Sequence, residues 1–164
     1  MTEALRIRQA VRGLIMTPDS SFLLVKFKIP NRPDLWGTPG GGIEHGETEA
    51  EALNRELIEE VGLHDGHIGE LLWDQQSLFK LRGGKYDGQR NKVFLVRAVD
   101  RFPPKPSMSW DQLNAECVYD IRWWSFDEIC AAPSTSFILE SFQSLVSDLV
   151  KNGPPANGPN IIGH

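Results

Sequence analysis

Residues 41–63 read GGIEHGETEAEALNRELIEEVGL, and this stretch decides the fold of the chain. It passes from a glycine-rich segment into a pattern typical of an α-helix. Thr48 can cap the N-terminus of that helix, and Glu51 three residues later completes a capping box. We expect the helix to run through Val61 and to end at Gly62, because glycine readily adopts the left-handed conformation of a C-terminal cap.

The predicted helix has two faces of different chemistry. At 3.6 residues per turn, the buried stripe is expected at Ala50, Leu53, Leu57 and Val61. Glu56, Glu59 and Glu60 fall together on another face, where like charges repel one another. Arg55 lies among them and can orient neighbouring glutamates. Taken alone, three glutamates are most simply interpreted as a solvated acidic face.

The surroundings favour a metal site instead. Glu44 and Glu47 precede the helix, so five carboxylates converge near one end of the glycine-rich segment. Such a cluster becomes favourable around a cation, and carboxylate oxygens with a backbone carbonyl suit Mg²⁺ or Mn²⁺. A zinc site is not indicated, because His45 is the one candidate ligand of that kind nearby. The glycines lack the spacing of known phosphate-binding loops, so phosphate would be held mainly through the metal.

The same stretch resembles the Nudix box, the signature of the Nudix hydrolase family, at every defining position. The matching residues are Gly41, Glu47, Arg55, Glu56, Leu57, Glu59, Glu60, Gly62 and Leu63. The resemblance implies an α/β fold, a Nudix-type α/β/α sandwich around a mixed β-sheet. It also implies an enzyme, a pyrophosphohydrolase that uses Mg²⁺ or Mn²⁺ to hydrolyse a nucleoside diphosphate linked to another moiety.

The resemblance also implies roles for individual residues. Glu59 and Glu60 are expected to bind the metal, and Glu56 to bind it or to take a proton from the attacking water. Arg55 is expected to orient these glutamates. The backbone carbonyl of Gly40, just before the box, is a further expected ligand.

Two positions beyond this set remain open. Glu47 is expected to be structural or to lie outside the ligand set. Glu116 is the candidate for a fourth metal-binding carboxylate, with Asp111 and Asp120 as competitors, and each can equally be a plain surface residue. The general base differs between Nudix branches, so it is not assigned.

The rest of the chain predicts strands interleaved with a few helices. A hairpin is expected over residues 8–27, and further strands are expected at residues 68–73, 76–81, 92–99 and 118–124. Ser125 with Glu128 forms a second capping box that opens a short helix. An amphipathic helix is expected over residues 137–150, and a proline-rich loop over residues 102–110.

Length and composition limit the function further. The 164 residues predict a single Nudix domain over residues 1–151 and a Gly/Pro-rich tail, extended or disordered, over residues 152–164. The net charge of −5 disfavours a protein that mainly holds duplex nucleic acid. No apolar run approaches a membrane span, and two isolated cysteines suit a reducing cytoplasm. We therefore expect a cytoplasmic monomer or homodimer without a membrane partner.

The substrate is only coarsely predicted. A basic stretch, Lys80, Arg82, Lys85, Arg90 and Lys92, can steer phosphates or can simply keep a strand edge soluble. Trp36, Trp73, Phe79 and Tyr86 can stack on a base or pack internally. The proline or tyrosine by which two Nudix branches mark their substrates is absent from residues 77–81. A small nucleotide or nucleoside triphosphate is expected as the substrate, and nucleic acid is not.

The alternative to an enzyme is a Nudix-fold module that binds or senses a nucleotide without cleaving it. A module that had lost catalysis would be expected to lose some glutamates of the box. Here Glu56, Glu59 and Glu60 are all present, which favours the hydrolase.

Overall fold

The computed structural model describes residues 4–78 and 85–163. The strands are β1 (Ile7–Met16), β2 (Ser21–Phe27), β3 (Leu35–Gly37), β4 (Gly40–Gly42), β5 (His67–Leu78), β6 (Gly88–Arg97), β7 (Val118–Ser125) and β8 (Asn160–Gly163). The helices are α1 (Glu49–Val61), α2 (Trp110–Ala115), α3 (Phe126–Ala131) and α4 (Phe142–Asn152), with a 3-10 turn, η1, at Ser134–Ser136.

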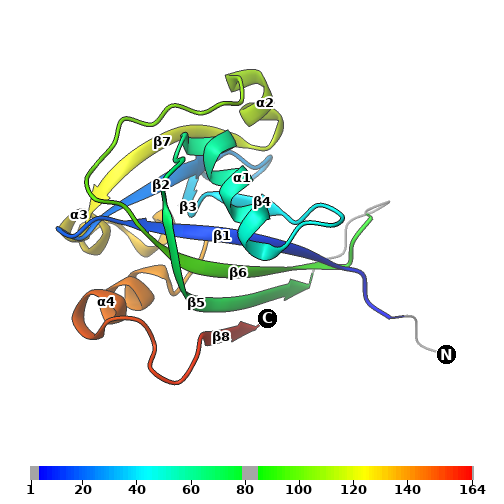
Figure 1. Cartoon of the computed structure of the whole chain (residues 1–164). Helices are drawn as coiled ribbons and strands as arrows, with labels where there is room; N and C mark the ends of the chain where they lie inside the picture. The colour runs from blue at the N-terminus through cyan, green and yellow to red at the C-terminus, as the bar shows by residue number, and fades with distance from the viewer. Residues whose placement is uncertain (1–3, 79–84, 164) are drawn as a thin grey trace.

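These strands form one mixed sheet. Its order is β3-β2-β1-β6-β5-β8, while β4 pairs with β1 and β7 pairs with β2. The β1–β6 and β5–β8 pairs are parallel, and the other pairs are antiparallel. The long parallel pairing of β1 with β6 joins the N-terminal hairpin to the β5–β6 ribbon, and α1 lies across this region of the sheet (Figure 1).

The sheet is buried on both faces, as strand β2 shows residue by residue. Phe22 and Leu24 belong to a core that includes residues of α3 and α4. Leu23 and Val25 belong to a second core with the apolar residues of α1. Because neighbouring side chains of a strand point to opposite faces, β2 reads as a continuous apolar run. The α/β/α sandwich around a mixed sheet is therefore confirmed.

Both predicted ends of helix α1 are confirmed. The Thr48 hydroxyl accepts from the Glu51 backbone N–H at 3.1 Å, and the Glu51 carboxylate accepts from the Thr48 N–H at 3.1 Å. Gly62 ends the helix in the left-handed conformation, at φ 74°. One position of the predicted stripe is wrong: Ala50 is exposed, and Ala52 is buried in its place.

The predicted hairpin and the predicted strand that forms β7 are confirmed. The strands predicted between them in the sequence need correction. The hairpin appears as β1 and β2, paired with Ile15 opposite Leu23. The two strands predicted at residues 68–73 and 76–81 are one continuous strand, β5, whose pairing with β6 shifts register twice. Residues 79–81 lie outside the described part. The predicted strand at residues 92–99 begins earlier, at Gly88, because β6 pairs with β1 along its whole length.

Two helical predictions also need correction. The C-terminal helix begins at Phe142 instead of residue 137, because Phe137 forms a bridge with Trp36 of β3 and the Ile138 N–H donates to the Trp36 carbonyl at 2.9 Å. Helix α2 was not predicted. Its signal is a capping box in which Ser109 and Gln112 bond each other's backbone N–H groups.

The segment at residues 152–164, predicted as an extended or disordered tail, contains strand β8. This strand pairs in parallel with β5, from Trp73 opposite Asn160 to Gln76 opposite Gly163. The division into a domain of residues 1–151 and a tail remains a prediction. Among the described residues, no helix is both long and apolar enough to cross a membrane.

The end of α1 gives a test of the fold. A Cβ on Gly62 would lie 2.1 Å from the Lys105 backbone oxygen, whereas a Cβ on Gly46, also at positive φ, would meet nothing within 4 Å. Gly46→Ala should therefore cost only the left-handed backbone penalty, about 1–2 kcal/mol. Gly62→Ala should lower the free energy of unfolding by about 3 kcal/mol or more, since strain and overlap combine.

Urea unfolding of both variants beside the wild type measures the difference. Equal losses at the two positions would contradict the tight approach of Lys105 to the helix end.

Candidate active site

Three carboxylates from two distant segments meet beside α1. Glu56 and Glu60 lie one turn apart on the helix and are 5% and 2% exposed. Glu116 is the C-cap residue of α2 and is exposed. One oxygen from each carboxylate lies within 4.8 Å of the other two. We call Glu56, Glu60 and Glu116 the carboxylate cluster, and its oxygens are of the kind that hard divalent cations prefer.

Burial makes the ionised cluster costly. Desolvation raises the pKa of Glu60 to about 8, against the opposing effects of Arg12 and of the Gly40 N–H, which donates to Glu60 Oε2 at 3.0 Å. Desolvation also raises the pKa of Glu56, although Arg55 opposes the shift. Glu56 Oε2 is buried and has no hydrogen-bond partner in the described part of the chain. An unpartnered oxygen on a carboxylate of this cluster fits the coordination of a cation.

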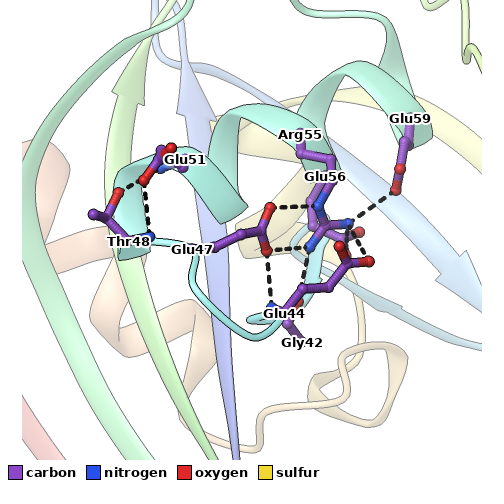
Figure 2. A network of polar contacts seen from close by, with 8 residues as sticks. All are labelled: Gly42, Glu44, Glu47, Thr48, Glu51, Arg55, Glu56 and Glu59. Atoms are coloured by element: carbon purple, nitrogen blue, oxygen red, sulfur yellow. Dashed lines mark hydrogen bonds and ion pairs between the residues drawn. The ribbon is translucent and has the colours of Figure 1, made fainter.

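Arg55 links the helix to the segment before it, as Figure 2 shows. Its Nε and Nη2 donate to both oxygens of Glu47, at 2.8 and 2.9 Å, in a two-pronged pair. Its Nη2 also donates to the Gly42 carbonyl at 3.0 Å. Its Nη1 reaches Glu56 at 3.0 Å and Glu59 at 3.3 Å. The guanidinium of Arg55 thus holds Glu56 through Oε1 and leaves Oε2 free.

Glu47 serves the loop rather than the cluster. Its carboxylate accepts from the Glu44 backbone N–H at 2.8 Å as well as from Arg55. These bonds lower the pKa of Glu47 to about 2, with the Arg55 hydrogen bonds as the largest cause. Glu47 therefore stays ionised across the physiological range and closes the turn between β4 and α1.

Glu59 lies apart from the carboxylate cluster. Its side chain is partly exposed and pairs with Arg55 one turn earlier on the helix. The group of potential ligands in the described chain contains Glu116 in its place. The expected roles of Glu59 as a metal ligand and of Gly40 through its carbonyl remain predictions.

The glycines at residues 40–42 form strand β4, a short strand that the sequence did not predict. Gly41 lies opposite Val11 of β1. A Cβ on Gly41 would lie 2.5 Å from Glu56 Oε1. Without side chains, β4 fits between β1 and the carboxylate of Glu56, which explains the glycine at the start of the box.

The two competing acidic residues lie elsewhere. Asp111 is in the first turn of α2. Asp120 lies on β7 opposite Lys26 and accepts from the Ile121 N–H at 2.8 Å. Neither belongs to the ligand group found among residues 4–78 and 85–163. Of the three candidates, Glu116 is the one that α2 brings beside α1.

Sequence reasoning missed Arg12. This residue interrupts the apolar run of β1 and lies opposite Gly40 of β4. Its Nε donates to Asn91 Oδ1 at 3.0 Å and its Nη1 to the Thr38 carbonyl at 2.9 Å. Burial lowers the pKa of Arg12, while Glu60 raises it. A charged residue within an otherwise buried strand was the available signal.

The predicted basic stretch is only partly described. Lys80, Arg82 and the aromatic Phe79 lie outside the described residues. Arg90 pairs with Asp74 through its Nε at 2.8 Å, and Lys92 pairs with Glu49 at 3.2 Å. These acidic partners offset part of the positive charge expected to steer phosphates.

Comparison with known proteins agrees with the fold and the box. The NUDIX domain model matches residues 6–143. An RNA pyrophosphohydrolase of Helicobacter pylori is 37% identical over 100 residues, which cover 56% of this chain and 64% of that protein, less than two thirds of its length. An RNA pyrophosphohydrolase of Rickettsia bellii is 32% identical over 133 residues, covering 77% of this chain and 80% of that one.

Solved structures extend the likeness at low identity. A NUDIX hydrolase from Nitrosomonas europaea aligns with TM-score 0.66 and 20% identity over 91% of this chain and 92% of that one. The E. coli dihydroneopterin triphosphate pyrophosphohydrolase aligns with TM-score 0.64 and 15% identity over 92% and 99%. At such identities the likeness shows the fold alone.

The carboxylate cluster should destabilise the metal-free protein. A carboxyl whose pKa rises from 4.5 to about 8 on folding contributes stability that is present below about pH 4.5 and lost as pH rises through about 8. Glu60→Gln removes this ionisation and keeps an oxygen for the Gly40 N–H. In EDTA the variant should gain at least 1 kcal/mol at pH 9, or roughly 2–4 °C in Tm, and gain less at pH 6.

Thermal unfolding followed by circular dichroism checks both pH values. Adding Mg²⁺ should raise the wild-type Tm more than that of Glu60→Gln. A variant less stable than the wild type at pH 9 in EDTA would contradict the cost assigned to Glu60.

Proposed function

The chain belongs to the Nudix family, and on that premise we propose that it is a metal-dependent pyrophosphohydrolase acting on a nucleotide-type substrate. The observation that carries this proposal is the carboxylate cluster, with two of its members buried and Glu56 Oε2 unpartnered in the described chain. Arg55 and Arg12 offset part of the cost of burying Glu56 and Glu60, and a cation that joins the three carboxylates would offset the rest.

We assign the residues of the site different roles in metal binding and catalysis. Glu56, Glu60 and Glu116 would hold Mg²⁺ or Mn²⁺, with Glu59 and the Gly40 carbonyl as further proposed ligands. When bound, the metal supplies charge neutralisation at phosphate oxygens and a bound water of lowered pKa. Arg55 fixes the Glu56 carboxylate from behind, and Arg12 adds positive charge beside Glu60. Glu56 would act as a ligand or as the base that takes a proton from the attacking water.

The bond proposed to break is a phosphoric anhydride. Water attacks phosphorus, one P–O bond of the pyrophosphate link breaks, and two phosphate products leave. The protein contributes mainly positioning and electrostatics, as is usual in phosphoryl transfer.

The names of the relatives widen the range of substrates that we propose. The proteins from Helicobacter pylori and Rickettsia bellii are both named RNA pyrophosphohydrolase. Those names speak against the expectation that nucleic acid is not a substrate, so we include the 5′-pyrophosphate end of RNA beside small nucleoside polyphosphates. The net charge of −5 does not oppose this, because hydrolysis at a chain end needs little duplex contact. A cytoplasmic location and a monomeric or homodimeric state remain predictions.

A nucleotide-binding module without hydrolysis is the alternative. No observation in the described chain favours it, since Glu56, Glu59 and Glu60 are all kept and Glu116 joins two of them.

Turnover with matched variants tests the enzyme. Phosphate and pyrophosphate release would be measured with Mg²⁺, Mn²⁺ or EDTA on nucleoside triphosphates, dinucleoside polyphosphates and a 5′-triphosphorylated oligoribonucleotide. We expect metal-dependent release that falls at least about 100-fold in Glu56→Gln and Glu60→Gln, because each removes a charge that holds the metal.

Glu51→Gln is the matched control. It makes the same chemical change on the same helix but leaves a glutamine that still completes the capping box, so activity should stay within about twofold. Turnover that survives EDTA, or equal losses in all three variants, would refute the proposed site. Tight nucleotide binding with no turnover would support the binding module instead.

A further inference from the structure

A cavity lies on the sheet face opposite α1, and its chemistry suits a flat heterocycle. Its volume is about 450 Å³. Aromatic and aliphatic side chains form about half of its lining, including Phe27, Trp36, Trp73, Ile138 and Phe142. Polar side chains complete the lining, from β5 and β6 and from the segments that precede them: Arg12, Arg32, Thr38, Gln75, Ser77, Gln89 and Asn91. Apolar walls with a few convergent polar groups are typical of a small-molecule site.

The polar side chains of β6 in this lining are organised by a chain of hydrogen bonds. Arg8 Nη1 donates to Gln89 Oε1 at 2.9 Å. The Gln89 amide nitrogen then donates to Asn91 Oδ1 at 2.9 Å. Arg12 Nε donates to the same Asn91 oxygen at 3.0 Å. Because arginine has no acceptor, the two arginines determine which way both amides face.

The consequence is a fixed donor in the cavity. Asn91 Oδ1 already accepts two hydrogen bonds, so its capacity is filled. Asn91 Nδ2 has no hydrogen-bond partner in the described part of the chain, and it is not among the buried unsatisfied atoms. Asn91 lines the cavity, and what its side chain has left to offer a ligand is a pair of N–H donors and no acceptor.

This donor distinguishes the common purines. Asparagine usually reads adenine with both ends of its amide, accepting from N6 and donating to N7. Asn91 cannot do this, because its oxygen is occupied. Guanine offers O6 and N7, two acceptors at the same edge, which match a side chain that only donates.

We propose that this cavity holds the base of the substrate and that Asn91, oriented by Arg12 and Gln89, is a specificity-determining residue that selects guanine over adenine. The inference deepens the proposed function and rests on it for the nature of the substrate. Arg12 connects the cavity with the carboxylate cluster. It lines the cavity, and it lies opposite Gly40, whose N–H donates to Glu60. A base in the cavity would therefore direct its phosphates past Arg12 toward the carboxylate cluster.

The test is a ratio of affinities, measured without turnover. The dissociation constants of GMP and AMP would be measured by calorimetry in EDTA for the wild type and for Asn91→Asp. The wild type should bind GMP about tenfold more tightly than AMP, as one well-placed hydrogen bond allows. Asn91→Asp keeps the shape but offers an acceptor, so the ratio should fall to one or invert toward AMP.

Two further variants keep the test decisive. Asn157→Asp adds the same charge at an exposed site and should leave the ratio unchanged. Gln89→Glu still accepts from Arg8 but no longer donates to Asn91, so it should reduce the ratio, and it serves if Asn91→Asp does not fold. A wild type that binds both nucleotides equally, binds neither at millimolar concentration, or keeps its preference in Asn91→Asp and Gln89→Glu would overturn the proposal.

The outcome is separable from that of the proposed function. Metal-dependent hydrolysis without base preference would retain the enzyme and reject the role of Asn91. Selective GMP binding that is lost in Asn91→Asp, in a protein without turnover, would retain the cavity and reject the hydrolase.

Discussion

Arg55 supplies the positive charge that the acidic side of α1 requires. Glu56, Glu59 and Glu60 lie within the helix, and Glu47 lies in the segment before it. One guanidinium reaches Glu47, Glu56 and Glu59 together and also holds the Gly42 carbonyl. A lysine could not make this arrangement, because it has a single point of charge and no planar fork. The loop and the helix are therefore one rigid unit, and the remaining parts of the site are built against it.

The other half of the site comes from the sheet and from α2. Glu60 turns away from Arg55 toward Gly40 and Arg12, so the two buried glutamates have different partners. Glu116 is brought to the cluster by α2, a short helix much later in the sequence. It is the exposed member of the cluster.

Local signals predicted what local interactions determine. The caps of α1 at Thr48 and Gly62, and the Ser125 cap of α3, depend on residues a few positions apart, so the sequence alone was sufficient. Strand β4 was not predicted because its glycines are required by the close approach of residues distant in sequence, Glu56 at Gly41 and Arg8 at Gly42. Phe137 was assigned to a helix because its pairing with Trp36 lies a hundred residues away in sequence. Arg12 was overlooked for the same reason, since its partners come from β4, β6 and α1.

Strand β8 has a consequence for the behaviour of the chain before it is fully folded. It covers the edge of β5 from Trp73 to Gln76, and it follows every other described strand in the sequence. An uncovered strand edge is a template for pairing with another molecule. During synthesis, β5 can form before residues 160–163 leave the ribosome, and until then its edge stays open. The nascent protein is therefore most prone to aggregate between the formation of β5 and the pairing of β8.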